Sequence, residues 1–246
     1  MKIGILIQAR LSSTRLPGKV LFKLGDTNHC SISLIKERLL SYDFNHDIEI
    51  ALLTTNNNCD EAITEFALEN NLKFYRGSEN NVLERYILGA ENFGFNLIVR
   101  ITSDCPFVDP DEINKLIEFY LNNNYEYVTN SFDGSTVIDG CDVEVFSLDS
   151  LKRINNLNPN QKEREHVTLK FLNEKNSNTF FLDPLLNYPY TRLTLDTPAD
   201  YKAINMLLKF IDNPVLVKME EIAFLYHSKD IFKINGYIER NSGWNK

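Results

Sequence analysis

The residues most suited to chemistry lie between Gln8 and Lys19, directly after a short apolar run. This stretch reads Gln8-Ala9-Arg10-Leu11-Ser12-Ser13-Thr14-Arg15-Leu16-Pro17-Gly18-Lys19 and combines two arginines, one lysine and three hydroxyls. Guanidinium, ammonium, hydroxyl and backbone N–H groups together can bind a polyanion. The stretch contains neither G-x-G-x-x-G nor G-x-x-x-x-G-K-[ST], so cations and hydroxyls would have to bind any phosphate. The alternative is a surface loop with solvated cations.

Two aspartates form a second candidate group. Asp104 follows the apolar run 97–101 and precedes a proline, and Asp196 ends the run 193–195. Thr197 and Asp200 are explained by the start of a helix at Pro198, which leaves Asp196 without a structural role. Two carboxylates at strand ends could hold one Mg²⁺, which prefers oxygen ligands and bridges phosphates. For Asp104 the alternative is a helix cap or a solvated loop acid.

The pattern of elements predicts where these groups meet. Apolar runs predict strands, and amphipathic segments between them predict helices. Strand, helix and strand alternate through the first hundred residues, which favours an α/β fold with a mostly parallel, doubly wound sheet. Ligands of such sheets bind beyond the carboxyl ends of the strands. The predicted strands are 3–7, 48–55, 73–76, 96–102, 125–130, 141–146, 180–182 and 192–195. The predicted helices are 31–40, 61–70, 82–93, 111–122, 148–154, 163–173, 198–210 and 220–227.

Length and composition narrow the class of protein. A chain of 246 residues fits one domain over 1–246, with a less regular lobe over about 131–190 that could face a substrate. The net charge of −8 argues against a nucleic-acid binder, which would need a basic surface. No apolar run reaches 18 residues and no signal peptide is evident, so no membrane span is predicted. Four scattered cysteines fit neither a zinc site nor a disulfide framework, which favours a reduced, cytoplasmic protein.

Several motifs in one order resemble the cytidylyltransferases that activate acidic sugars, the CMP-sialic acid and CMP-Kdo synthetase family. The first is the stretch from Ile7 to Lys19. The similarity spans about residues 3–205 and is closest to the spore coat polysaccharide biosynthesis protein F branch. The other motifs are Arg76-Gly77-Ser78, Val82-Leu83-Glu84-Arg85-Tyr86, Arg100-Ile101-Thr102-Ser103-Asp104-Cys105-Pro106, Asp142-Val143-Glu144-Val145-Phe146, Arg164-Glu165-His166-Val167-Thr168 and Arg192-Leu193-Thr194-Leu195-Asp196-Thr197-Pro198-Ala199-Asp200.

This resemblance implies a Rossmann-like nucleotide-diphospho-sugar transferase fold and a role for each matching residue. It implies a nucleotide site made by Gln8, Ala9, Arg10, Arg15, Lys19, Ser78 and Arg85, in which Arg10, Arg15 and Lys19 are catalytic and bind the triphosphate. It implies that Asp104 and Asp196 hold Mg²⁺. It implies that the sugar side is lined by Asp142, Glu144, Arg164, Glu165 and His166. The alternatives are a packed or capping histidine at 166 and ordinary surface charges at 164 and 165.

The implied reaction is transfer of CMP from CTP to an acidic sugar or phosphorylated acceptor, with release of pyrophosphate, for surface polysaccharide biosynthesis. One alternative is a nucleotidyltransferase that uses GTP or another NTP. Another is a glycosyltransferase on the same fold, and a third is a non-catalytic nucleotide-binding partner. The resemblance also implies a homodimer, but the lobe over 131–190 shows no long dimerisation hairpin.

Overall fold

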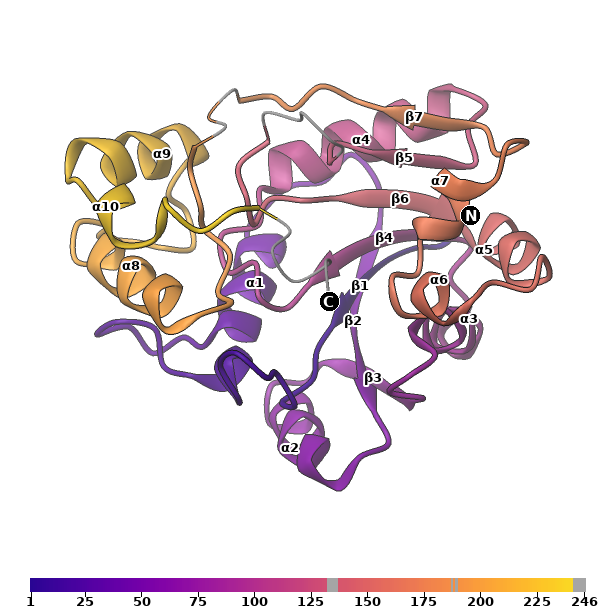
Figure 1. Cartoon of the computed structure of the whole chain (residues 1–246), viewed down its shortest axis with the longest axis horizontal. Helices are drawn as coiled ribbons and strands as arrows, with labels where there is room; N and C mark the ends of the chain where they lie inside the picture. The colour runs from indigo at the N-terminus through magenta and orange to yellow at the C-terminus, as the bar shows by residue number, and fades with distance from the viewer. Residues whose placement is uncertain (132–136, 187, 189, 241–246) are drawn as a thin grey trace.

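A computed structural model describes residues 1–131, 137–186, 188 and 190–240. Its centre is one mixed sheet with the strand order β3-β2-β1-β4-β6-β5-β7 (Figure 1). Parallel pairing joins β1 to β2 and β4, β2 to β3, and β5 to β7, whereas β6 runs antiparallel to both its neighbours. The strands are β1 (Ile3–Gln8), β2 (Ile48–Thr55), β3 (Lys73–Gly77), β4 (Leu97–Thr102), β5 (Tyr127–Thr129), β6 (Glu144–Ser147) and β7 (Thr179–Phe181). The α/β class and the mostly parallel sheet are confirmed.

Helices cover both faces of this sheet. One face packs on α1 (Ser31–Leu40), α2 (Glu61–Glu69) and α4 (Pro110–Asn122). The other packs on α3 (Val82–Phe93), α5 (Leu148–Asn155) and α7 (Leu169–Asn173). The first five residues of β1 are buried on both faces of the sheet, which is why this run is continuously apolar rather than alternating.

A third apolar cluster lies outside the sheet and contains the C-terminal helices. It joins α8 (Pro198–Leu208), α9 (Met219–Ser228) and residues near α10 (Phe232–Asn235) to Leu24, Leu34 and the segment after residue 137. These helices lie beyond the carboxyl ends of β1 and β4 (Figure 1). Residues 236–240, after α10, run back toward those strand ends (Figure 1). Trp244 and residues 132–136, 187 and 189 of the predicted lobe fall outside the described residues.

The sheet has its topological switch point at β1. The chain moves from β1 to β2 and β3 on one side and then crosses to β4 on the other side. Open α/β sheets bind ligands at such a point, beyond the carboxyl ends of the two strands. The loops that follow these strands are the cationic stretch after β1 and the segment that contains Asp104.

Three predicted elements differ from the structure. Residues 192–195 form no strand beyond a bridge between Arg192 and Asp139. Leu193 N–H donates to the carbonyl of Asp139, but Leu195 N–H donates to the carbonyl of Asp104, so the two do not pair with the same neighbouring segment. The strand predicted over 141–146 starts at Glu144, since Val143 N–H donates to the Asn130 side chain.

The third difference is the helix predicted over 163–173, which is divided into α6 (Gln161–Glu165) and α7. Val167 lies between them with a φ of 50°. A β-branched residue in this left-handed region cannot continue a right-handed helix, so the helix ends before it. The remaining two elements are short 3₁₀ turns, η1 (Lys19–Leu21) and η2 (Asn58–Asp60). In the part of the chain that the structure describes, no helix is both long and apolar enough to span a membrane.

Candidate active site

The cationic loop after β1 is folded by its own backbone and by one buried carboxylate. Gly18 has a φ of 75°, and its N–H donates to the carbonyl of Leu11 at 3.0 Å, which closes the loop. Leu11 N–H donates to Oδ1 of Asp60 at 2.7 Å, and the hydroxyl of Thr55 donates to the other oxygen. Glycine is suited to the left-handed position because it has no Cβ. Asp60 thus links the loop to the end of β2, a role that sequence reasoning missed.

Lys19 lies between the two aspartates that were predicted to hold a metal ion. Its Nζ is 2.8 Å from Oδ2 of Asp104 and 2.9 Å from Oδ1 of Asp196. Arg15 pairs with the other oxygen of Asp196. The structure therefore brings together four residues of the predicted set, from three distant parts of the chain.

The electrostatics of this cluster are dominated by the lysine. Burial alone would raise the pKa of Asp104, but the Lys19 charge and the hydrogen bonds from Lys19 and Thr102 lower it to about 2. Burial would likewise lower the pKa of Lys19, but the two carboxylates raise it above its ordinary value. Both partners are thus charged at neutral pH, and the cluster is an ion triad rather than a shared proton.

The position of each aspartate is fixed from outside the cluster. Thr102 donates a 2.6 Å hydrogen bond to Oδ1 of Asp104. The backbone N–H of Asp196 donates to Asp200, which also forms a capping box with Thr197 at the start of α8. Arg192 holds Asp200 through two hydrogen bonds of 2.8 and 3.0 Å. The helix start predicted at Thr197 and Pro198 is confirmed, and the capping box found there also supports the neighbouring Asp196.

The first residues of the cationic loop contact Glu79, which lies just after the end of β3. Ser12 donates to Glu79 at 2.8 Å, Asn57 donates at 2.6 Å, and Arg10 lies 3.5 Å away. Ser12 and Asn57 are the main reason that the pKa of Glu79 lies below its ordinary value. The sequence signal for Glu79 is an acid just after a predicted strand, opposite a cationic loop.

Ser78 and Arg85, expected near the base or ribose, contact each other beside Glu79. The Ser78 hydroxyl accepts from Asn81 N–H at 3.0 Å, and its carbonyl accepts from the buried Arg85 at 2.5 Å. Burial lowers the pKa of Arg85. Among its polar atoms Nε has no protein partner. A buried N–H of this kind is available to a bound oxygen atom, since such groups are normally paired.

Two of the predicted nucleotide residues line the end of β1. Ala9 is buried, and its N–H still pairs with Leu53 of β2. Gln8 directs Oε1 toward Nη2 of Arg100, at 3.4 Å. Arg100 in turn pairs with Glu144. Arg100 therefore links the Gln8 side chain to Glu144, one of the residues expected on the sugar side.

The residues expected on the sugar side fall into two separate groups. Glu144 is buried and also accepts hydrogen bonds from Tyr127 and Thr168. His166 belongs to the same group, because the charges of Arg100 and Glu144 act on it. Burial is the main cause that lowers the pKa of His166.

The second group is Asp142, which pairs with Arg240 of the C-terminal tail. Arg164 donates to the carbonyl of Pro159 at 3.0 Å. Glu165 is exposed. The structure thus gives Glu144 a full set of protein partners and leaves Asp142 the more accessible of the two carboxylates.

A metal ion fits between the two aspartates by the chemistry of the donors. Among the described residues, no group of three or more His, Cys, Asp and Glu side chains is arranged to hold a metal. Mg²⁺, however, needs one or two carboxylates and takes its other ligands from water and phosphate. Asp104 and Asp196 supply that number, and both contact a cation already.

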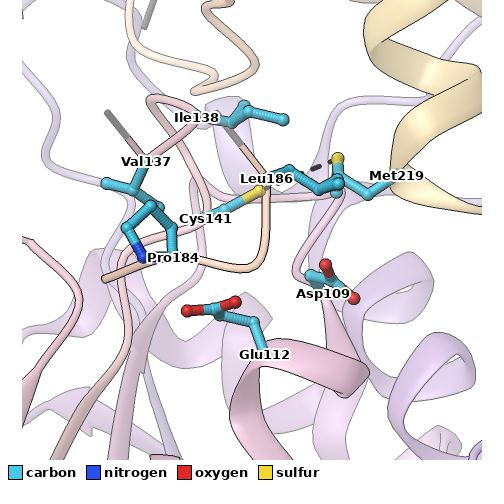
Figure 2. A pocket seen from close by; sticks show the side chains of 8 residues that line it. All are labelled: Asp109, Glu112, Val137, Ile138, Cys141, Pro184, Leu186 and Met219. Atoms are coloured by element: carbon cyan, nitrogen blue, oxygen red, sulfur yellow. Dashed lines mark hydrogen bonds between the residues drawn. The ribbon is translucent and has the colours of Figure 1, made fainter. Parts of the chain in front are cut away.

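A small pocket lies where the start of α4 faces α9 (Figure 2). Its polar wall is formed by Asp109 and Glu112, and burial is the main cause that raises the pKa of both, that of Asp109 to about 6. Glu112 accepts hydrogen bonds from Asn130 and from Leu185 N–H. The remaining lining residues are mostly apolar: Val137, Ile138, Cys141, Pro184, Leu186 and Met219. None of them belongs to the predicted site.

Comparison with known proteins agrees with this arrangement. Residues 4–231 match the cytidylyltransferase family. The spore coat polysaccharide biosynthesis protein SpsF of Bacillus subtilis is 31% identical over 93% of this chain and 95% of its own. A cytidylyltransferase structure from Leptospira borgpetersenii superposes with a TM-score of 0.86, at 31% identity over 96% of this chain and 98% of that one.

A more distant structure shares the fold. It is a CMP:2-keto-3-deoxy-manno-octonic acid synthetase in complex with CTP, with a TM-score of 0.63 at 16% identity over 85% of this chain and 99% of that one. The predicted Rossmann-like fold is confirmed by these neighbours. With a family match across most of its length and the cation and carboxylate cluster at the switch point, the chain belongs to the cytidylyltransferase family of nucleotidyltransferases.

Proposed function

We propose that this protein transfers CMP from CTP to an acidic sugar or a related acceptor and releases pyrophosphate. The observation that carries the proposal is the ion cluster at the end of β1 and β4, in which Lys19 and Arg15 contact Asp104 and Asp196. Cations and carboxylates that alternate in this way suit a substrate that brings both phosphate and a metal ion.

The reaction requires positioning and charge neutralisation more than covalent chemistry. An acceptor oxygen attacks the α-phosphorus, a new P–O bond forms, and the bond to the bridging oxygen breaks. Pyrophosphate leaves with the electron pair of that bond, and the acceptor hydroxyl proton passes to water. Lys19 and Arg15 oppose the charge that grows on the leaving group. Arg10 lies near the start of the same loop and adds a third cation to it.

A magnesium ion held by Asp104 and Asp196 would polarise phosphate oxygens and would add to this neutralisation. The chain's own part is to present those two carboxylates. The backbone N–H of Asp196 is held by Asp200, and Asp104 is held by Thr102. These contacts do not depend on any ligand, so the donor atoms are in place before substrate arrives.

The choice of CTP and of an acidic acceptor is supported by the relatives. The related structure in complex with CTP is a synthetase for an acidic sugar, and SpsF is named for spore coat polysaccharide biosynthesis. We therefore also propose a role in surface polysaccharide biosynthesis. The four cysteines are free in the structure, which supports the cytoplasmic location we propose.

The test is pyrophosphate release with each of the four NTPs, Mg²⁺ and a panel of acidic sugars and sugar phosphates. We expect release with CTP and one sugar acid. Release with GTP alone would show that the substrate is a guanine nucleotide rather than CTP, and would leave the proposed roles of the cluster unchanged. No release with any pair, despite nucleotide binding measured by calorimetry, would contradict nucleotidyl transfer and favour a glycosyltransferase or a non-catalytic partner.

A matched pair of lysine variants tests the loop itself. Lys19→Ala removes the buried ammonium, and Lys23→Ala removes an exposed one four residues further on. We expect turnover to fall by about 10²- to 10³-fold in the first variant, as for loss of one group that stabilises the transition state. The second variant should retain wild-type turnover. Near-normal turnover of a folded Lys19→Ala variant would contradict the role of the loop.

A further inference from the structure

Two carboxylates beside the cluster, Asp139 and Asp142, each pair with an arginine. Asp139 and Asp142 lie close to each other, and the Asp142 charge acts on both Asp139 and Cys105, the neighbour of Asp104. The cations at positions 15 and 19 contact the two metal-site aspartates. An acceptor that carries a carboxylate or phosphate therefore needs another cation on its own side of the site.

Two arginines near this surface are committed to internal partners. Arg192 binds Asp200 through two hydrogen bonds and Asp139 through a third, and its side chain is 6% exposed. Arg100 pairs with Glu144, and its side chain is 13% exposed. Both guanidinium groups compensate buried carboxylates, and removing either would leave a buried charge without a partner.

Arg240 differs from them in exposure and in its place in the chain. Its side chain is 24% exposed, and that of its partner Asp142 is 36% exposed. Arg240 belongs to the C-terminal tail, which crosses from α10 toward the carboxyl ends of β1 and β4 (Figure 1). Its Nη1 donates to the carbonyl of Val137 at 2.8 Å, and Nη2 donates to Ser131 at 3.3 Å and to Asp142. The tail thus delivers a partly exposed guanidinium to Asp142, one of the residues expected on the sugar side.

We propose that Arg240 is the residue that recognises the anionic group of the acceptor, a carboxylate or phosphate, and so sets the preference for acidic substrates. The inference rests on the nucleotidyl transfer proposed above. A guanidinium presents five N–H donors in one plane, and the contacts with described residues use three hydrogen bonds. An incoming anion can thus bind Arg240 while the backbone contact at Val137 keeps the side chain in place.

Asp142 has a defined part in this arrangement. Without an acceptor it neutralises Arg240 and keeps the tail beside residues 137–142. An acceptor anion would compete with Asp142 for the same Nη2 edge. Because a partly exposed ion pair contributes less stability than a buried one, the pair can exchange one carboxylate for another at modest cost.

The test separates acceptor binding from nucleotide binding. Initial rates of pyrophosphate release are measured with CTP and with N-acetylneuraminate or 3-deoxy-manno-octulosonate for wild type, Arg240→Met and Arg240→Lys. The control is Arg153→Met, which removes an arginine that pairs with Glu126 on the other side of the molecule. Circular dichroism and the KM for CTP report whether each variant is folded.

We expect Arg240→Met to raise the KM for the acceptor by about 10- to 100-fold, as for loss of one charge-assisted contact, with kcat and the KM for CTP within about threefold. Arg240→Lys should give an intermediate rise, because it keeps the charge but not the planar donors. The carboxamide of the same sugar should be a poorer acceptor than the acid for wild type, and Arg240→Met should lose that discrimination. Arg153→Met should match wild type.

The outcomes separate this inference from the function on which it rests. No release by wild type with any acidic acceptor overturns the proposed function, and the inference with it. Release by wild type together with an unchanged acceptor KM in Arg240→Met overturns the inference alone. An equal rise in the KM values for acceptor and CTP, or a variant that keeps its preference for acid over carboxamide, would show a purely structural role and would also overturn it. If Arg240→Met does not fold, Arg240→Lys and the carboxamide comparison decide between these outcomes.

Discussion

Replacement of Lys19 by methionine should make the stability of this protein depend on divalent metal ions. Methionine keeps the volume of the lysine stem but removes the ammonium, which lies 2.8 and 2.9 Å from oxygens of Asp104 and Asp196. The variant therefore leaves two partly buried carboxylates without the cation between them. A metal ion is the natural replacement for that cation.

The expected magnitude follows from the burial of the three groups. Removing one partner of a buried ion pair destabilises by about 3 to 5 kcal/mol. The low end applies here, because Asp104 is 28% exposed and Arg15 still faces Asp196. A loss of about 3 kcal/mol corresponds to a fall in Tm of roughly 6 to 12 °C for a chain of this size.

Addition of Mg²⁺ or Mn²⁺ should reverse much of that loss. A ligand at one hundred times its Kd stabilises the folded state by about 2.7 kcal/mol. In wild type the ammonium occupies the same carboxylate oxygens, so the ion must compete with it and its effect should be smaller. The expected result is a metal-dependent rise in Tm that is several degrees larger in Lys19→Met than in wild type.

The assay is thermal unfolding at pH 7.5, in EDTA and in MgCl₂ or MnCl₂ at roughly 10 mM, a concentration that saturates weak sites. It compares wild type, Lys19→Met and the control Lys23→Ala. Manganese binding by electron paramagnetic resonance gives an independent measure of affinity. Equal metal effects in wild type and Lys19→Met would refute the reasoning. A wild-type Tm in metal-free Lys19→Met would do the same.

Three further predictions concern residues around the site. Burial and then the charge of a nearby aspartate raise the pKa of Asp109 from 3.8 to about 6, so its ionised form destabilises the fold as pH rises through that range. Asp109→Asn keeps a good helix cap, and urea unfolding should show it more stable than wild type by up to about 3 kcal/mol at pH 8 but not near pH 4. An equal gain at both pH values would contradict this. Gly140→Ala should lose at least about 2 kcal/mol, because φ is 104° and a Cβ would lie 2.6 Å from the backbone nitrogen of Thr194; an unchanged urea midpoint would exclude this. Asn235→Ala should cost about 2 kcal/mol, because it removes a 2.9 Å hydrogen bond from the buried carboxylate of Asp200, and turnover should fall with it; wild-type turnover would show that α10 does not help to position the site.

Position after a predicted strand indicated Asp104 and the cationic stretch that contains Lys19. Lys19 lies 85 residues from Asp104 and 177 from Asp196 along the chain. Parallel strands bring their carboxyl ends together, so element order predicts that the segments after β1 and β4 meet. The strand predicted before Asp196 does not form beyond the bridge at Arg192, and the hydrogen bond from Leu195 N–H to the carbonyl of Asp104 brings Asp196 to the cluster instead. The contact of the lysine with both carboxylates was not predicted, because one residue's position does not show which charges its side chain will reach.

The direction of β6 and the partners of its first residue show where sequence reasoning stops. An alternating run predicted a strand here, but the run is the same whether the strand is parallel or antiparallel. The antiparallel pairing places Glu144 opposite Arg100 in the register of β4. An arginine within an otherwise apolar strand was a usable signal, because a buried guanidinium requires a carboxylate partner.

The central cluster also explains how nucleotide and metal ion could assist each other. If Lys19 and Arg15 bind the triphosphate as we propose, their contacts with Asp104 and Asp196 weaken, and those carboxylates become better ligands for a cation. A cation held by those carboxylates would repel the ammonium and favour its contact with phosphate. Each ligand would then favour the other, and such coupling is reciprocal by thermodynamic necessity. The ligand-free ion pairs thus keep the charges of the site neutralised in place, so that binding exchanges partners rather than exposing unpaired charge.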